Sequence, residues 1–171
     1  EEFSVTELFK GDYGTPSMEL ALHSHAMIRN AYLLGTLEQQ QRFVPLLALV
    51  EAFMPDSTLI IDANFYAGLT YLSWAKNEPD QQEQHIENAQ SIIQKFAIWQ
   101  QDSNENYLHR YLLLKAELAA LEQRHLDAQT LYSDAIKAAQ DFDYLVIEAL
   151  ANERYACYWS EQKQERTAAL F

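Results

Sequence analysis

The second half of the sequence lacks the two residues that most often mark turns. All four glycines and all four prolines lie before residue 80, and the remainder contains neither. A β-rich fold of that length needs glycine or proline at several turns, whereas antiparallel helices are joined by short polar turns. The absence therefore predicts helix throughout the second half. The polar turns that we expect lie at 101–106, 122–125 and 140–143.

Cysteine and long apolar runs are also scarce. Cys157 is the only cysteine, which excludes an intrachain disulfide and a multi-cysteine metal site. No Asn-x-Ser/Thr acceptor occurs, and both absences favour a reducing, cytoplasmic setting. No run approaches the roughly 20 apolar residues of a membrane span. We therefore expect no membrane contact.

Basic residues are few. The sequence has 12 lysines and arginines and 25 aspartates and glutamates, which gives a net charge of −13. The acids are spread along the chain, and no basic cluster offsets them locally. A field of this sign repels phosphate backbones, so nucleic acids and anionic membranes are poor partners.

Catalytic motifs are missing as well. The sequence contains no glycine-rich phosphate loop and no H-E-x-x-H, and no serine stands in an order with histidine and an acid that suggests a nucleophile. His23 and His25 are two residues apart, which points them away from each other on a helix, so they cannot share a metal. We therefore predict no catalytic, cofactor-binding or metal-binding residue, and no enzyme activity in this segment.

Apolar residues, by contrast, are plentiful enough for a core. They make up 49% of the 171 residues, with 12% aromatic, and this length suits one domain, 1–171. Thr15 as N-cap with Pro16 at the first helical position should start the first helix, and Gly35 should end it after Leu34. Pro45 should kink or divide the second helix. The helices that we expect cover 15–34, 37–54, 57–78, 79–102, 106–123, 126–140, 144–162 and the start of one in 163–171.

The later helices alternate between broadly apolar and one-sided. That order is typical of stacked helical hairpins, with the first helix of each on the inside. Superposing the one-sided helices places Ala89, Ala128 and Thr167 in register, 39 residues apart. Such a period indicates a helix-turn-helix solenoid. Within the best hairpin we expect Ala116 to face Ala128 and Ala135, and Tyr132 to fill the gap to the next hairpin.

This pattern resembles the tetratricopeptide repeat (TPR), with small residues at Ala116, Ala128 and Ala135 and an aromatic at Tyr132. It departs from that repeat at Gln123, where a turn glycine is usual, and at Gln140, where a closing proline is usual. The resemblance implies an all-α fold of about seven to eight helices, in which antiparallel hairpins stack into a right-handed superhelix.

A more specific resemblance covers 64–171. The ordered set NFY, YLHRYLLLKAELA, LYSDAI and EALANE is similar to the helical-repeat region of large bacterial multidomain signalling proteins. Those proteins join a serine/threonine-kinase-like domain, a STAND-type ATPase, the repeats, a GAF domain and a sensor histidine kinase. None of the kinase or ATPase motifs stands in this sequence. The resemblance implies repeats truncated in the last hairpin, a divergent first hairpin at 15–63 and an N-terminal extension at 1–14.

The function that this resemblance implies is a non-catalytic interaction and coupling module in two-component signal transduction. Its partners would be a protein, neighbouring domains of the same chain, or a second copy in a homodimer. The register suggests a partner groove lined by Arg110, Leu113, Glu117 and Asn152. The same residues suit interhelical polar pairs equally well. The alternative functions are a small-molecule-sensing domain of a STAND-type regulator and a purely structural oligomerisation module.

Overall fold

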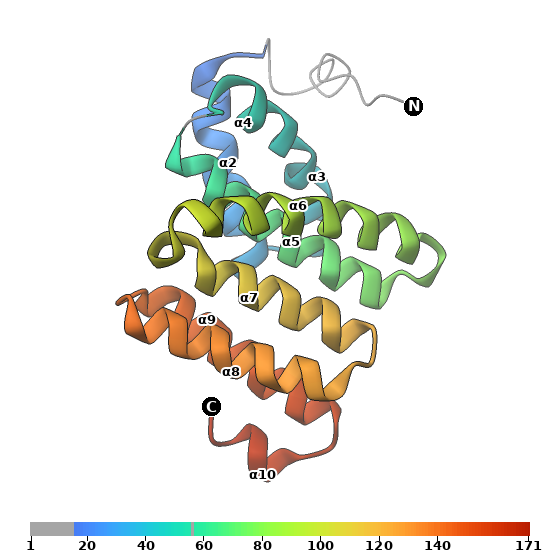
Figure 1. Ribbon diagram of the computed structural model, residues 1–171. Coiled ribbons are helices and arrows are strands. Elements are labelled where there is room, and N and C mark those ends of the chain that lie inside the picture. The colour runs from blue at the N-terminus through green and yellow to red at the C-terminus, as the bar shows by residue number, and fades with distance from the viewer. Residues whose placement is uncertain (1–15, 56) are drawn as a thin grey trace. The chain divides into compact units, whose positions relative to one another are not determined.

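Every regular element that the structure describes is a helix. The computed structural model describes residues 16–55 and 57–171, and these contain α-helices and two short 3-10 helices without any strand (Figure 1). The predicted all-α fold is therefore confirmed. The chain forms two compact units, of which one ends at Ser73 and the other begins at Trp74.

The first unit is built from α2 and the three short helices that follow it. The elements are α2 (Met18–Leu34), α3 (Leu37–Phe43), η1 (Val44–Leu46), α4 (Leu47–Phe53) and the greater part of α5 (Thr58–Asn77). α2 packs against α3, η1 and α4. The centre of this contact is a cluster of Ala21, Leu46 and Leu49, all fully buried. Further along α2, Tyr32 contacts Tyr66 of α5, with ring centres 5.7 Å apart.

The start of α2 differs from the prediction. Ser17 is the N-cap, and its side chain accepts a hydrogen bond from the Leu20 N–H at 3.2 Å. Pro16 precedes this cap and is not the first helical residue, and Thr15 lies outside the described residues. A serine with extended backbone satisfies a free N–H of the first turn directly, which moves the start to Met18. The end at Leu34, before Gly35, is confirmed.

Pro45 divides the second helical stretch, as predicted. The chain tightens into η1 at Pro45, between α3 and α4, because proline has no N–H to continue the α-helical ladder. The next helix begins after Ser57, whose Oγ accepts a hydrogen bond from the Leu59 N–H at 3.1 Å.

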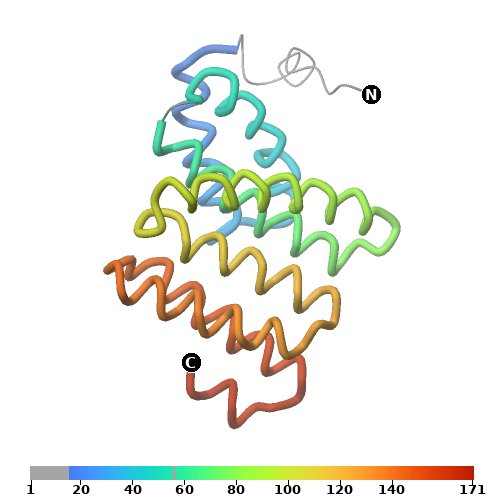
Figure 2. Tube along the Cα trace, viewed as in Figure 1, coloured from blue at the N-terminus to red at the C-terminus, as the bar shows by residue number. Residues whose placement is uncertain are grey.

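The second unit is a succession of antiparallel helices that follows the C-terminal end of α5. Its elements are η2 (Pro79–Gln81), α6 (Gln82–Asp102), α7 (Asn104–Leu121), α8 (His125–Asp141), α9 (Leu145–Glu161) and α10 (Glu165–Ala168). Each α-helix from α6 to α10 packs against the next one, most extensively α7 against α8, and the tube in Figure 2 doubles back after each helix.

The link between α6 and α7 is shorter than the turn predicted at 101–106. Only Ser103 separates the two helices, with extended backbone, φ −155° and ψ 94°. The Asn106 side chain donates a hydrogen bond to the Ser103 Oγ at 2.9 Å. One extended residue is enough to end a helix. The polar residues on either side of Ser103 are therefore helical, as the last residues of α6 and the first residues of α7.

Three later turns share one backbone geometry. Gln123, Asp143 and Lys163 have φ of 59°, 58° and 59°, at equal intervals along the chain. In each turn the next residue donates a backbone hydrogen bond five residues back, as from Arg124 to Ala119 at 2.9 Å. This is the Schellman ending of a helix, which favours glycine at the left-handed position. Gln123, noted above for replacing a usual glycine, adopts the glycine conformation.

The equal turns correct part of the predicted repeat register. Ala168 follows Lys163 by the same interval at which Ala128 follows Gln123. Ala128 is fully buried and Ala168 is 9% exposed, whereas Thr167 is only partly buried. Ala168, and not Thr167, is therefore the equivalent of Ala128 in the last hairpin.

We expect Gln123→Gly to stabilise the protein. A left-handed conformation costs a side-chain-bearing residue about 1–2 kcal/mol, while glycine loses about 0.5–1 kcal/mol through backbone entropy. The net gain should be about 0.5–1 kcal/mol in the free energy of unfolding, measured by urea denaturation. Glu122→Gly, one residue earlier at φ −78°, is the matched control and should destabilise. A change of the same sign in both variants would contradict this explanation.

Candidate functional site

Small residues line the contact between α7 and α8. Ala116 of α7 and Ala128 and Ala135 of α8 are all 0% exposed. Side chains of this size let two helices approach to about 8 Å, at the close end of the usual range. These three alanines therefore belong to the interior of a hairpin and offer no surface to a ligand.

Tyr132 fills the space between α8 and α9. Its ring is 1% exposed and stacks on Tyr155 of α9, with ring centres 5.0 Å apart and planes at 16°. Tyr158, one turn further along α9, lies 5.6 Å from the same ring. This tyrosine thus packs against the first helix of the following hairpin.

The Tyr132 hydroxyl ends at a charged pair that joins α7 to α9. It donates a hydrogen bond to Glu117 Oε1 at 2.8 Å. Arg154 of α9 donates to both Glu117 oxygens, from Nε at 2.8 Å and from Nη2 at 2.9 Å. Burial first, and then the Glu117 charge, raise the pKa of Tyr132, so its hydroxyl remains a donor. Glu117, Tyr132 and Arg154 form one unit, which we call the tyrosine clamp.

A second link joins the beginnings of α7 and α9. His109 of α7 is fully buried and stacks on Tyr144, the N-cap residue of α9, with ring centres 4.1 Å apart. The Tyr144 hydroxyl donates to Asn106 Oδ1 at 2.8 Å. Residue 106 thus pairs with 144 and residue 117 with 154, so α7 and α9 run side by side in the same direction.

Burial and a hydrogen bond from Arg110 together keep His109 in its neutral form. The Arg110 Nη1 donates to His109 Nε2 at 2.8 Å and to the Asn106 carbonyl at 3.1 Å. The guanidinium lies 5.3 Å from the centre of the Tyr144 ring. Burial first, and then the Arg110 charge, lower the pKa of His109 to about 3. The ring is therefore uncharged at neutral pH.

The four residues of the predicted partner groove have different surroundings. Leu113 is 0% exposed, so it belongs to the core and cannot line an open groove. The sequence does not show this, because a helix that is apolar on several sides does not reveal which side is covered. Glu117 is bonded within the tyrosine clamp, which fits the interhelical alternative. Arg110 and Asn152 remain partly exposed, and the Asn152 amide donates to the Glu148 carbonyl at 2.9 Å.

Sequence reasoning missed the partners of these residues. Arg154 was not singled out, and neither was the stacking of His109 on Tyr144. Both contacts join residues more than thirty positions apart. The sequence signal is weak, because a glutamate within a broadly apolar helix favours a cation nearby but does not show which cation pairs with it.

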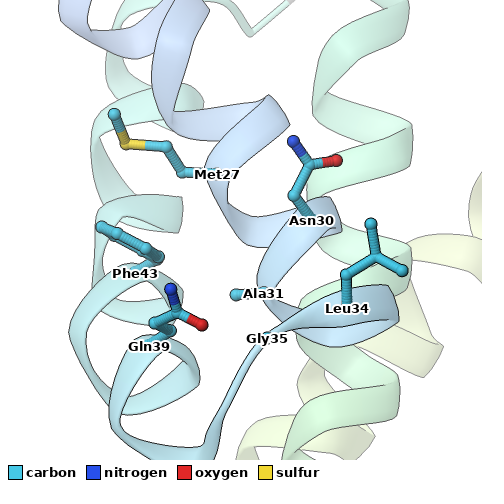
Figure 3. Close-up of a pocket in the computed structure, with 7 residues that line it drawn as sticks. All are labelled: Met27, Asn30, Ala31, Leu34, Gly35, Gln39 and Phe43. Carbon is cyan, nitrogen blue, oxygen red and sulfur yellow. The ribbon is translucent and has the colours of Figure 1, made fainter.

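The first unit contains a separate pocket between α2 and α3. The cavity measures about 290 Å³ and is open on one side. Figure 3 shows side chains from both helices around it, with the Gln39 nitrogen directed into the space between them. Its lining residues are Met27, Asn30, Ala31, Leu34, Gly35, Gln39 and Phe43.

Two other kinds of site do not occur in the part of the chain that the structure describes. Over 16–55 and 57–171, no three or more histidine, cysteine or acidic side chains are grouped to hold a metal ion. No helix in the same residues has the length and apolar character to cross a membrane.

Breaking the tyrosine clamp should destabilise the fold. The Glu117 side chain is 11% exposed, and Arg154→Met leaves its charge without a cation. We expect a loss of about 1–3 kcal/mol in the free energy of unfolding, measured by urea denaturation. Asp127→Asn is the matched control, because its pair with Arg124 is exposed, and its effect should stay below about 1 kcal/mol. Equal effects would show that the clamp contributes no more than a surface pair.

His109 should make stability fall in mild acid. Its pKa is about 3 in the folded chain and about 6.5 when unfolded, so the unfolded chain binds the extra proton first. The stability is fully present above pH 6.5 and is lost as the pH falls towards 3. From pH 7.5 to 5 the loss from this group is about 2 kcal/mol.

The measurement compares denaturation of the native chain and His109→Leu at both pH values. The variant should lose about 2 kcal/mol less than the native chain over this interval, whatever its absolute stability. His23→Gln, at an exposed histidine, should keep the native difference. An unchanged pH dependence in His109→Leu would contradict the assignment.

Comparison with known families agrees with this geometry. A family model described as CHK1-like, TPR repeats matches residues 48–169, which include the helices from α5 to α9 and the tyrosine clamp. No curated protein and no solved structure matches the chain. TPR repeats generally mediate protein-protein interactions. Since the match covers well over half of the sequence, the chain belongs to the family of CHK1-like TPR repeats.

Proposed function

We propose that this chain is a non-catalytic interaction module that couples neighbouring domains of a multidomain bacterial signal-transduction protein. The family supports interaction in general, and the resemblance of 64–171 to the repeats of such proteins supports the signalling context. The partners would be domains of the same chain that lie beside the repeats.

The observation that carries the proposal is the side-by-side arrangement of α7 and α9. The two helices are joined near their starts by the His109–Tyr144 stack and further along by the tyrosine clamp. Between these links, α7 carries the partly exposed Arg110 and α9 carries the partly exposed Asn152. Arg110 is held by hydrogen bonds to Asn106 and His109, so little side-chain freedom remains to be lost on binding.

This surface suits a polar protein segment. Arg110 offers a positively charged, planar donor group, and Asn152 offers a carboxamide on the neighbouring helix. Arginine is among the residues that most often dominate the energy of an interface. A partner that contacts α7 and α9 together would be sensitive to their spacing. This would let binding at the surface respond to a change in the packing of the hairpins.

The test uses the polypeptides encoded on either side of this segment in its parent reading frame. Each is expressed separately, and its binding to the chain is measured by calorimetry. We expect Arg110→Ala and Asn152→Ala to weaken binding about 5- to 30-fold. Arg166→Ala, at an exposed arginine on α10, is the matched control and should bind like the native chain.

Thermal unfolding of each variant separates binding from folding. Arg110→Ala also removes contacts with His109 and the Tyr144 ring, so its melting temperature should fall. Loss of affinity in Asn152→Ala at an unchanged melting temperature supports the surface. Absence of binding by both flanking polypeptides would contradict the coupling function. An equal loss in Arg166→Ala would contradict the location.

A further inference from the structure

The pocket between α2 and α3 lies outside the matched repeats. All of its lining residues fall between 27 and 43, whereas the family match begins at residue 48. We propose that this pocket binds one uncharged apolar side chain, of leucine or methionine size, from a segment of a partner protein. The inference adds a second contact surface to the proposed interaction module.

The lining explains why the guest side chain must be uncharged. No charged residue lines the cavity, whose walls are apolar at Met27, Ala31 and Phe43. A charged group placed there would lose its hydration without gaining a counter-charge. At about 290 Å³ the space lies at the lower end of ligand pockets and suits a single side chain better than an extended ligand.

Apolar residues are exposed beside the opening. Leu34 lines the pocket and is 88% exposed, and Leu33 and Leu37, close in sequence, are 41% and 52% exposed. The Leu34 side chain thus leaves apolar surface in water at the pocket itself. A partner segment that inserts one side chain would also cover this rim.

The link between α2 and α3 at Gly35 is tightly packed within the chain itself. A Cβ on Gly35 would lie 2.6 Å from the Ala31 carbonyl oxygen, so only glycine fits there. Thr36 and Gln39 form a capping box that starts α3. The Gln40 amide reaches back to the Ala31 carbonyl at 3.3 Å and ties the two helices together. A preformed pocket loses little entropy on binding.

Two carboxamides at the pocket, of Asn30 and Gln39, favour a peptide as the ligand. Asn30 is exposed at the edge of the pocket, and a carboxamide can both donate to and accept from a backbone peptide group. Gln39 Oε1 accepts the Thr36 N–H at 2.9 Å, while its nitrogen is directed into the space between the helices (Figure 3). An isolated apolar molecule would leave both amides unused.

The charge of the chain favours particular residues in the partner segment, on either side of the inserted side chain. The net charge of −13 attracts a basic segment at long range. The lining of the pocket itself carries no charge, so a lysine placed in the pocket would lose its hydration without gaining a counter-charge. The partner segment therefore carries a neutral anchor with basic residues a few positions away.

The experiment follows the methyl group of Met27 by NMR in the full chain, with methionine methyls labelled. Met27 lines the pocket, and Met18, 62% exposed on the first turn of α2, is an internal reference. The probe is the blocked peptide Lys-Ser-Gly-Leu-Gly-Ser-Lys, compared with versions carrying alanine or glutamate in place of leucine. We expect a saturable shift of Met27 alone, with affinity about tenfold lower for both replacements.

Variants locate the contact without disturbing the fold. Leu34→Asp and Asn30→Ala change exposed side chains and should weaken the leucine peptide about tenfold and about threefold. Leu126→Asp, at a leucine 77% exposed on α8, is the matched control and should bind normally. Equal weakening by the control would overturn the site.

Three further outcomes would overturn the proposal. Equal binding of the alanine peptide would show that no side chain enters the pocket. Equal affinity for 3-methylbutan-1-ol would assign the site to small molecules. A Met27 shift on deleting residues 1–15, with no peptide present, would make that segment the occupant. Each result leaves the α7–α9 surface untouched, since other residues and other probes test it.

Discussion

The close approach of α7 and α8 is the constraint on which the second unit depends. Alanines with no exposed surface lie on both helices, and this pair makes the most extensive contact of the unit. A larger side chain at Ala116 or Ala128 would push the helices apart, because interiors are packed at the density of organic crystals. Tyr132 would then leave its place against α9, and its hydroxyl would leave Glu117. The polar contacts of Tyr132 thus depend on the packing of the small residues between α7 and α8.

The tyrosine clamp gives this packing a defined register. Apolar contacts between hairpins tolerate small shifts, since burial is non-directional. A bidentate arginine-carboxylate pair does not, because both hydrogen bonds require one geometry. Glu117 also accepts the Tyr132 hydroxyl, so three helices meet at one carboxylate. The polar groups of the clamp are bonded to one another and are not offered to a partner. For this reason the proposed partner surface centres on Arg110 and Asn152.

The sequence predicted the elements well and their partners poorly. Pro45 and Gly35 act through their own backbone, so the division at Pro45 and the helix end before Gly35 were accessible from sequence. The burial of Leu113 was not, because an all-round apolar helix gives no preferred side. The pocket between α2 and α3 was also beyond reach. It depends on how two helices cross at Gly35, and no periodicity describes that crossing.

The equal spacing of the left-handed turns explains how distant residues meet. Gln123, Asp143 and Lys163 end successive helices in the same way, so each helix with its turn contributes the same length of chain. Two such steps bring the path back to its original direction, which places α9 beside α7 and parallel to it. An insertion of one residue in α8 would turn the end of α8 by about 100° about its axis. The chain would then enter α9 in another direction, and Arg154 would move away from Glu117. The clamp therefore depends on the length of α8 as much as on the identity of its three residues.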